Sequence, residues 1–246
     1  MNGSRARLGL ILPSVNRATE ADLYRCLPAG VTAHFTRMQF RESSREYYER
    51  MVNDVPEGAE MLSHAQVHAL MFACTTGSLY GGLGYDQRII STMQQHCTAP
   101  CSTTSTAVVE ALRELGARRI SIVTPYPDWL DELERQFIQD SGFEVTNIQG
   151  MGLMDCGDVL PEDVYRFAKR YADRSADVLF ISCMGLRTLD VLPYLEKDLG
   201  MTVVSSNQLT LWKLLRMAEI PTEDLAADFG SFMRRRVVRL SASSRA

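Results

Sequence analysis

Residues 69–74 read Ala-Leu-Met-Phe-Ala-Cys, and residues 178–183 read Val-Leu-Phe-Ile-Ser-Cys. Each stretch is a short apolar run that ends in a cysteine, Cys74 or Cys183, and is followed by small or polar residues. This pattern predicts a buried strand that carries a thiol at its C-terminal end. Because open α/β sheets bind their ligands at that edge, the two stretches predict an active site with paired thiols.

The rest of the chain alternates between predicted strands and predicted helices. The predicted strands cover residues 8–13, 31–38, 69–73, 119–124, 143–148, 178–182 and 202–205. Residues 77–84 are rich in glycine and predict a loop, and residues 100–105 predict a polar turn. Strands that alternate with helices of about 10–15 residues indicate βαβ units and parallel sheets.

The two halves of the sequence correspond to each other. Residues 8–13 match 120–125, residues 69–74 match 178–183, and residues 101–105 match 204–208. Such a duplication predicts an α/β fold of two pseudo-symmetric lobes, each a parallel, flavodoxin-like sheet flanked by helices. We expect one lobe to cover 1–115 plus 209–246 and the other 116–208. Equivalent strand ends then face each other across a cleft, which brings Cys74 and Cys183 together.

Composition excludes several classes of function. The 246 residues are 46% hydrophobic and carry a net charge of −4, so there is no overall basic field for nucleic acid or an anionic membrane. No apolar run reaches the roughly 18 residues of a membrane-spanning helix. The first residues lack the apolar core of a secretory signal peptide. We therefore expect a cytoplasmic protein without nucleic-acid or membrane partners.

The other cysteines suggest no metal or disulfide framework. The 6 cysteines and 4 histidines do not have the spacing of a zinc site, and a reducing cytoplasm disfavours disulfides. Free cysteines usually pack as small apolar residues. We predict this packing role for Cys26, Cys97, Cys101 and Cys156.

Two thiols that face one small planar acid permit two kinds of reaction. One thiol can remove a proton while the other delivers one, which racemises a stereocentre. Alternatively, one thiol attacks an activated double bond and the other protonates the neighbouring carbon. Each cysteine precedes a predicted helix start, where backbone N–H groups lower a thiol pKa and hold a carboxylate. The residues expected to supply these groups are Thr75, Thr76, Met184 and Gly185.

Further polar residues follow the first strand of each half. Ser14 and Asn16 follow residues 8–13, and Tyr126 follows residues 119–124. Such side chains either hydrogen-bond a substrate carboxylate or form turns and helix caps, and the residues alone leave both alternatives open. A protein of another class, which binds a carboxylate in the cleft without reactive thiols, is also compatible with the sequence.

Five motifs make the chain similar to the aspartate/glutamate racemase superfamily, and within it to the maleate cis-trans isomerase branch. They are Leu-Pro-Ser-Val-Asn (12–16), Ala-Cys-Thr-Thr-Gly-Ser (73–78), Thr-Pro-Tyr (124–126), Ser-Cys-Met-Gly-Leu-Arg (182–187), and Val-Val-Ser-Ser-Asn-Gln (203–208) followed by Trp212. The resemblance covers residues 7–218. It implies a cofactor-independent isomerase of a small unsaturated dicarboxylate such as maleate, in which Cys74 attacks the olefin and Cys183 donates a proton.

The same resemblance assigns the substrate carboxylates to Asn16 and Tyr126 and implies a homodimer or a higher homo-oligomer. The ectoine-utilisation proteins of this superfamily are also similar, so a two-cysteine racemase or epimerase of a small amino acid is the alternative. Arylmalonate decarboxylases keep only the second cysteine, so Cys74 favours isomerisation over decarboxylation. The chain departs from the family at Cys156, which occupies the place of an asparagine that is common in the segment 152–157.

Overall fold

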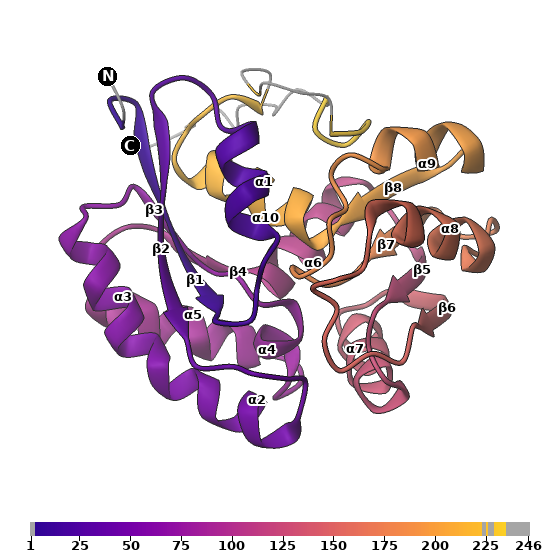
Figure 1. The fold of residues 1–246 in the computed structure, drawn as a ribbon, viewed down its shortest axis with the longest axis horizontal. Helices are drawn as coiled ribbons and strands as arrows, with labels where there is room; N and C mark the ends of the chain where they lie inside the picture. The colour runs from indigo at the N-terminus through magenta and orange to yellow at the C-terminus, as the bar shows by residue number, and fades with distance from the viewer. Residues whose placement is uncertain (1–2, 223–224, 226–228, 235–246) are drawn as a thin grey trace, which may run out of the picture.

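The computed structural model describes residues 3–222, 225 and 229–234, which contain two parallel β-sheets flanked by helices (Figure 1). The strands are β1 (Ala6–Pro13), β2 (Val31–Met38), β3 (Ala69–Phe72), β4 (Cys101–Thr103), β5 (Arg119–Thr124), β6 (Glu144–Gly150), β7 (Val178–Ile181) and β8 (Thr202–Ser205). The helices are α1 (Thr19–Cys26), α2 (Arg45–Met51), the 3₁₀ helix η1 (Val52–Asp54), α3 (Val55–His64), α4 (Thr75–Leu79), α5 (Tyr85–His96), α6 (Thr104–Glu114), α7 (Asp128–Asp140), α8 (Pro161–Tyr171), α9 (Leu192–Leu199) and α10 (Ser206–Met217).

The two sheets have the same topology. Their strand orders are β2-β1-β3-β4 and β6-β5-β7-β8, and every strand pair is parallel. The central strands β3 and β7 are buried along their whole length, as expected when helices cover both faces of a parallel sheet. The predicted α/β class with two pseudo-symmetric parallel sheets is therefore confirmed.

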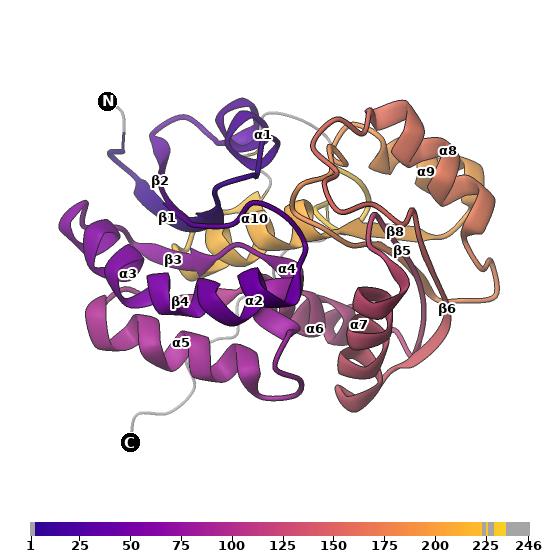
Figure 2. The ribbon, with the colours of Figure 1, turned by 60° about the horizontal axis from the view of Figure 1, so that its bottom comes forward.

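Side chains of the first sheet alternate between two apolar layers. Leu8, Leu10 and Leu12 of β1 pack with side chains of α1, α6 and α10. Ile11 faces the opposite side and packs with side chains of α3 and α5, so helices cover both faces (Figure 2). Among the described residues, no helix has both the length and the apolar character needed to cross a membrane.

Two segments differ from their predicted form. The prediction of a polar turn at residues 100–105 is wrong, because Cys101–Thr103 form the edge strand β4, which pairs with Leu70–Phe72. These polar residues are buried, and Thr103 Oγ1 caps α6 by accepting the N–H of Thr106 at 3.1 Å. The first residues of the predicted loop 77–84 belong instead to α4, which begins at Thr75.

Helix α10 connects the two lobes. It begins directly after β8 of the second sheet and packs against α6 and β3 of the first lobe (Figure 1). Thr104 Oγ1 and Thr210 Oγ1 are 3.0 Å apart, and Lys213 Nζ lies 2.6 Å from Glu110 Oε2. The predicted lobe boundaries stay a prediction, and residues 235–246 of the first lobe lie outside the described residues.

Candidate active site

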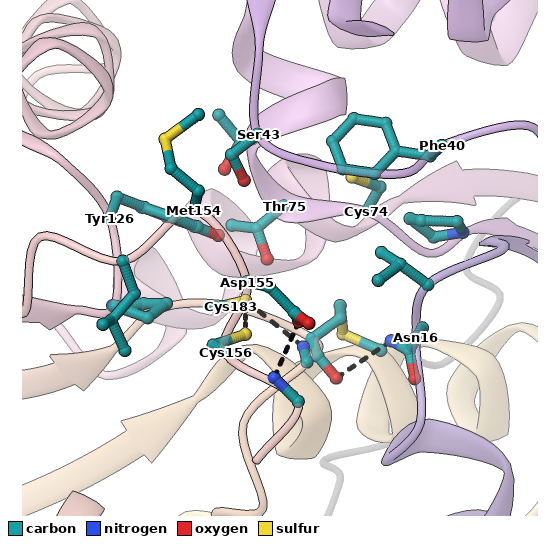
Figure 3. Close-up of a pocket in the computed structure, with 18 of the residues that line it drawn as sticks. Asn16, Phe40, Ser43, Cys74, Thr75, Tyr126, Met154, Asp155, Cys156 and Cys183 are labelled. Carbon is teal, nitrogen blue, oxygen red and sulfur yellow. Dashed lines mark hydrogen bonds between the residues drawn. The ribbon is translucent and has the colours of Figure 1, made fainter. Parts of the chain in front are cut away.

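A pocket lies between the two lobes, and both Cys74 and Cys183 line it (Figure 3). Its empty space, counting the solvent at its mouth, is about 590 Å³. The first lobe contributes Pro13, Val15, Asn16, Arg17, Phe40, Ser43, Tyr48, Cys74, Thr75 and Thr76. The second lobe contributes Pro125, Tyr126, Leu153, Met154, Asp155, Cys156, Gly157, Cys183, Met184 and Gly185.

Cys74 follows β3 and forms the N-cap of α4. Its Sγ accepts a hydrogen bond from the Gly77 N–H at 3.4 Å. Gly77 permits this approach, because a Cβ at that position would lie 2.6 Å from Met51 Sδ and 2.9 Å from Cys74 Sγ. Burial nevertheless raises the pKa of the Cys74 thiol to about 12. Cys74 is therefore a neutral thiol near pH 7.

Cys183 lies two residues beyond β7 in a different local structure. The prediction that a helix starts after it is wrong, because α9 begins only at Leu192. Cys183 instead has a φ of 102°, a strained conformation for a residue with a side chain, which costs on the order of 1–3 kcal/mol and is typical of functional sites. Two hydrogen bonds stabilise the turn: the Cys183 N–H donates to Ser206 Oγ at 3.0 Å, and the Gly185 N–H donates to Cys183 Sγ at 3.3 Å.

Hydrogen bonds to its sulfur lower the pKa of the Cys183 thiol below its ordinary value. The largest contribution comes from the Cys156 thiol; burial opposes it, and the Tyr126 hydroxyl and the Gly185 N–H add to it. Donors of this kind stabilise a thiolate. Of the two predicted catalytic thiols, Cys183 is therefore the one that ionises first.

Cys156 is a third thiol in the pocket, and the prediction that it only packs in the core is wrong. It is half-buried, and its Sγ lies 3.6 Å from Cys183 Sγ. Its hydrogen bond to Cys183 raises the pKa of the Cys156 thiol, so Cys183 ionises before Cys156. Cys156 belongs to the irregular segment 151–160, whose path no local pattern predicts. The feature of the sequence that could have identified Cys156 as a pocket residue is its position, which the family commonly fills with an asparagine.

Tyr126 lies where the sequence predicts a substrate ligand. It follows β5, is 5% exposed, and lines the pocket beside Cys183. Its backbone N–H donates to Thr124 Oγ1 at 3.0 Å, which fixes the turn after the strand. Burial raises the pKa of the Tyr126 hydroxyl well above its ordinary value, so Tyr126 keeps its proton at neutral pH and can donate a hydrogen bond.

The two threonines after Cys74 have different environments. Thr75 Oγ1 donates to Ser206 Oγ at 2.9 Å, the same oxygen that accepts the Cys183 N–H. Thr76 Oγ1 is buried and has no hydrogen-bond partner among the described residues, although it lies close enough to Tyr48 to affect the pKa of that hydroxyl. The first N–H groups of a helix also have no partner within it. Thr76 therefore offers a hydroxyl and a backbone N–H to a ligand.

The structure brings Asn16 to the pocket but not Ser14. Asn16 Oδ1 accepts the backbone N–H groups of Ala18 and Thr19, at the start of α1, at 3.0 Å each. Its Nδ2 donates to Thr19 Oγ1 at 2.9 Å and to the Met184 carbonyl at 3.1 Å. The Asn16 amide thus joins the two lobes and has no hydrogen-bonding group left over in this state. Ser14 Oγ pairs with the backbone of Phe40 at 2.8 and 3.0 Å and is not among the pocket-lining residues.

The charged groups of the pocket neutralise each other. Arg17 and Asp155 are the charged residues among those that line it, and Arg17 Nη2 lies 2.7 Å from Asp155 Oδ2. Both side chains are about half exposed, at 45% and 47%, which places the pair at the rim. Within the part of the chain that the structure describes, no three His, Cys, Asp or Glu side chains are grouped to hold a metal ion.

Glu134 is a buried carboxyl group behind the pocket. It lies on α7 and is 0% exposed, and neither carboxyl oxygen has a hydrogen-bond partner among the described residues. Burial raises the pKa of Glu134 to about 8, and the nearby Ser182 hydroxyl offsets part of this rise. Glu134 is therefore uncharged at neutral pH, and its ionisation would place a negative charge near Cys183.

Glu134 makes the stability of the fold depend on pH. When unfolded it ionises near its ordinary pKa of 4.5, but when folded it holds its proton to about pH 8. Its contribution to stability is thus complete below pH 4.5 and is lost as the pH rises to about 8. We expect the melting temperature of Glu134→Gln to fall less over this pH range than that of the wild type. At the alkaline end of the range, the variant should have the higher melting temperature. Glu132→Gln, on the same helix but 71% exposed, is the control and should not change the curve; identical curves for Glu134→Gln and the wild type would contradict the assignment.

Comparison with known proteins gives consistent matches over nearly the whole chain. The family model of arylmalonate decarboxylase matches residues 8–229. The arylmalonate decarboxylase of Bordetella bronchiseptica is 28% identical over 226 residues, 87% of this chain and 91% of that protein. The maleate isomerase of Pseudomonas putida is 29% identical over 230 residues, 87% of this chain and 92% of that protein. A solved Nocardia farcinica maleate cis-trans isomerase, a cysteine-to-serine mutant with a covalently bound succinylcysteine intermediate, superposes with a TM-score of 0.87 at 26% identity and covers 94% of this chain and 99% of its own.

Proposed function

Because the chain belongs to the arylmalonate decarboxylase family, we propose that it is a cofactor-independent cis-trans isomerase of a small unsaturated dicarboxylate such as maleate. The observation that carries the proposal is the pair of thiols, Cys74 and Cys183, that two equivalent strand ends bring to one pocket. Maleate isomerases among the similar proteins, one of them with a succinylcysteine intermediate, support it.

The ionisation of the two thiols suggests how the reaction begins. Cys183 enters as the thiolate and accepts the proton of Cys74, which is neutral in the resting state. The Cys74 sulfur then bonds to one olefinic carbon, and the electron pair of the double bond moves to the neighbouring carbon. Cys183 returns the proton to that carbon. The product of these steps is a succinyl group bound to Cys74.

The geometric change follows from this intermediate. The former double bond is now a single bond, so rotation about it is allowed. Cys183 then removes a proton from the carbon that was protonated, the double bond re-forms, and the bond to the Cys74 sulfur breaks with the electron pair returning to sulfur. Cys183 gives its proton back to Cys74, and the trans isomer leaves with no net change in the protein.

Neutral donors bind the carboxylates in this proposal. Arg17, the cation among the described residues that line the pocket, is paired with Asp155 at the rim. The donors we assign to the carboxylates are the hydroxyls of Tyr126 and Thr76 and backbone N–H groups of lining residues, including Thr75 and Met184. Fixed dipoles in a site that excludes water stabilise negative charge as it develops on the substrate. Asn16 contributes by holding the Met184 carbonyl at 3.1 Å, which keeps the second lobe in place.

The pocket favours an unsaturated acid over an amino acid. A racemase must also bind an ammonium group, for which a carboxylate is the usual partner. Asp155 is the acidic residue of the pocket lining, and Arg17 already occupies it. A carboxylate-binding protein without catalysis would not need the arrangement of donors that lowers the pKa of Cys183. The racemase and the binding protein are therefore the second and third candidates.

A direct assay separates these candidates. We expect the full chain, without added metal or cofactor, to convert maleate to fumarate, which proton NMR distinguishes by the olefinic signals. In heavy water, L-aspartate and L-glutamate should show no deuterium at the α-carbon above the rate without enzyme. Deuterium uptake at that carbon, with maleate unchanged, would instead assign a racemase, and inertness toward all three compounds would favour the binding protein.

Two further expectations from the sequence stay predictions. The resemblance implies that the chain forms a homodimer or a higher homo-oligomer, and the composition implies a cytoplasmic location without nucleic-acid partners. Both are part of the proposal, and residues from both lobes of a single chain line the pocket.

A further inference from the structure

Cys156 and Cys183 are close enough to react with each other. Their Sγ atoms are 3.6 Å apart, and a disulfide bond requires about 2.05 Å, so an approach of roughly 1.5 Å would join them. Gly185 leaves space beside the two sulfurs, because it has no side chain. A Cβ at position 185 would lie 2.8 Å from Cys156 Sγ.

The backbone around Cys156 is suited to this approach. Residues 151–160 connect β6 to α8 and contain no helix or strand. Two glycines, Gly152 and Gly157, flank Cys156 within this segment, and glycine restricts the backbone less than any other residue. Cys183 is held by its N–H bond to Ser206, and Cys156 by the hydrogen bond that its carbonyl accepts from the Val159 N–H at 3.1 Å. Because Cys156 lies in the segment without regular structure, we assign the movement to Cys156.

The chemical states of the two sulfurs are complementary. Cys183 is stabilised as a thiolate and Cys156 retains its proton. Thiolates, not thiols, react with peroxides. Both residues are half-buried rather than fully enclosed, and the pocket opens to solvent, so a small hydroperoxide has access to Cys183.

We propose that Cys156 and Cys183 form a peroxide-sensitive thiol pair in which Cys183 is oxidised and Cys156 resolves it to a disulfide. The Cys183 thiolate attacks one oxygen of a hydroperoxide, the O–O bond breaks, and hydroxide or alkoxide leaves with the electron pair. Cys183 is then a sulfenic acid. The Cys156 sulfur attacks the Cys183 sulfur, the S–O bond breaks, and the Cys156 proton leaves with the oxygen as water. Both sulfurs are oxidised and one peroxide is reduced.

This reaction would switch catalysis off reversibly. The disulfide removes the proton-transfer group of the proposed isomerase, and a dithiol such as dithiothreitol restores it by exchange. Without Cys156, a sulfenic acid on Cys183 would proceed to sulfinic and sulfonic acids, which dithiols do not reduce. Cys156 thus also protects Cys183 from permanent damage.

Another pair of neighbouring cysteines provides an internal comparison. Cys97 and Cys101 lie close together, but both are buried, and burial raises the pKa of Cys101 to about 12. Neither thiol has the set of donors found at Cys183. We therefore expect peroxide to oxidise the pocket pair first.

Mass spectrometry of the full chain tests the proposal independently of any isomerase activity. The reduced protein is treated with graded hydrogen peroxide, free thiols are alkylated, and tryptic peptides are separated without reduction. We expect an intact mass lower by two hydrogens before alkylation, and a disulfide between the peptides 136–166 and 175–187, which carry Cys156 and Cys183. Dithiothreitol should remove the link completely.

Two variants complete the test. In Cys156→Ser, we expect Cys183 to gain two or three oxygens that dithiothreitol does not remove. Cys101→Ser, which eliminates the other thiol pair, should form the 156–183 disulfide as the wild type does. The proposal is overturned if Cys183 of the wild type is oxidised irreversibly to the same extent as in Cys156→Ser, or if the first disulfide links Cys183 to peptide 51–88, which carries Cys74.

Discussion

Cys74→Ala is expected to abolish the isomerisation of maleate, with turnover falling on the order of 10⁴-fold or more, the scale seen when an enzyme loses its nucleophile. Cys74 Sγ is the atom proposed to bond to the olefinic carbon, and among the described residues of the first lobe no other thiol lines the pocket. Initial rates of fumarate formation, followed by NMR at saturating maleate, measure the loss.

A second buried cysteine supplies the control for this substitution. Cys97 is 6% exposed and is not among the pocket-lining residues, so Cys97→Ala removes a similar thiol from the core without touching the site. It should retain activity near that of the wild type. Circular dichroism must show that Cys74→Ala is folded. A folded Cys74→Ala protein with more than about a tenth of wild-type turnover would rule out nucleophilic attack by Cys74.

Cys183→Ser is expected to reduce turnover by about 10²–10⁴-fold, the usual contribution of general acid–base catalysis, and to leave a succinyl adduct on Cys74. A serine hydroxyl at this position ionises far less readily than the Cys183 thiol, so it neither takes the proton from Cys74 nor removes one from the adduct. The attack of Cys74 on maleate becomes slow, but the release of product from the adduct becomes slower still. Peptide mass spectrometry after long incubation with maleate locates the adduct on the peptide 51–88.

The same experiment tests which thiol attacks. Cys183 is the better thiolate in the resting protein, whereas burial raises the pKa of Cys74 to about 12. The proposal assigns this thiolate to proton transfer rather than to attack. If Cys74→Ala instead accumulates an adduct on the peptide 175–187, the two roles are reversed. If neither variant forms an adduct, isomerisation does not pass through a covalent intermediate.

Most of the fold could be predicted from sequence features that are local and that occur in both halves of the chain. Apolar runs of strand length predict β3 and β7 because both are buried on two faces, and the duplication of those runs predicts two lobes with one topology. The edge strand β4 was missed, since its residues Cys101–Thr103 are polar. Its pairing with β3 depends on a partner about thirty residues away, which local pattern does not reveal.

The sequence by itself determined that Cys74 and Cys183 end two equivalent strands, because strand burial and duplication are visible in the order of residues. Only the tertiary structure decided how the two thiols differ. One is buried with a single N–H donor, and its pKa rises. The other is surrounded by Cys156, Tyr126 and Gly185, and its pKa falls. A pKa is the sum of contacts made through space, and two of these three donors come from segments distant in the chain.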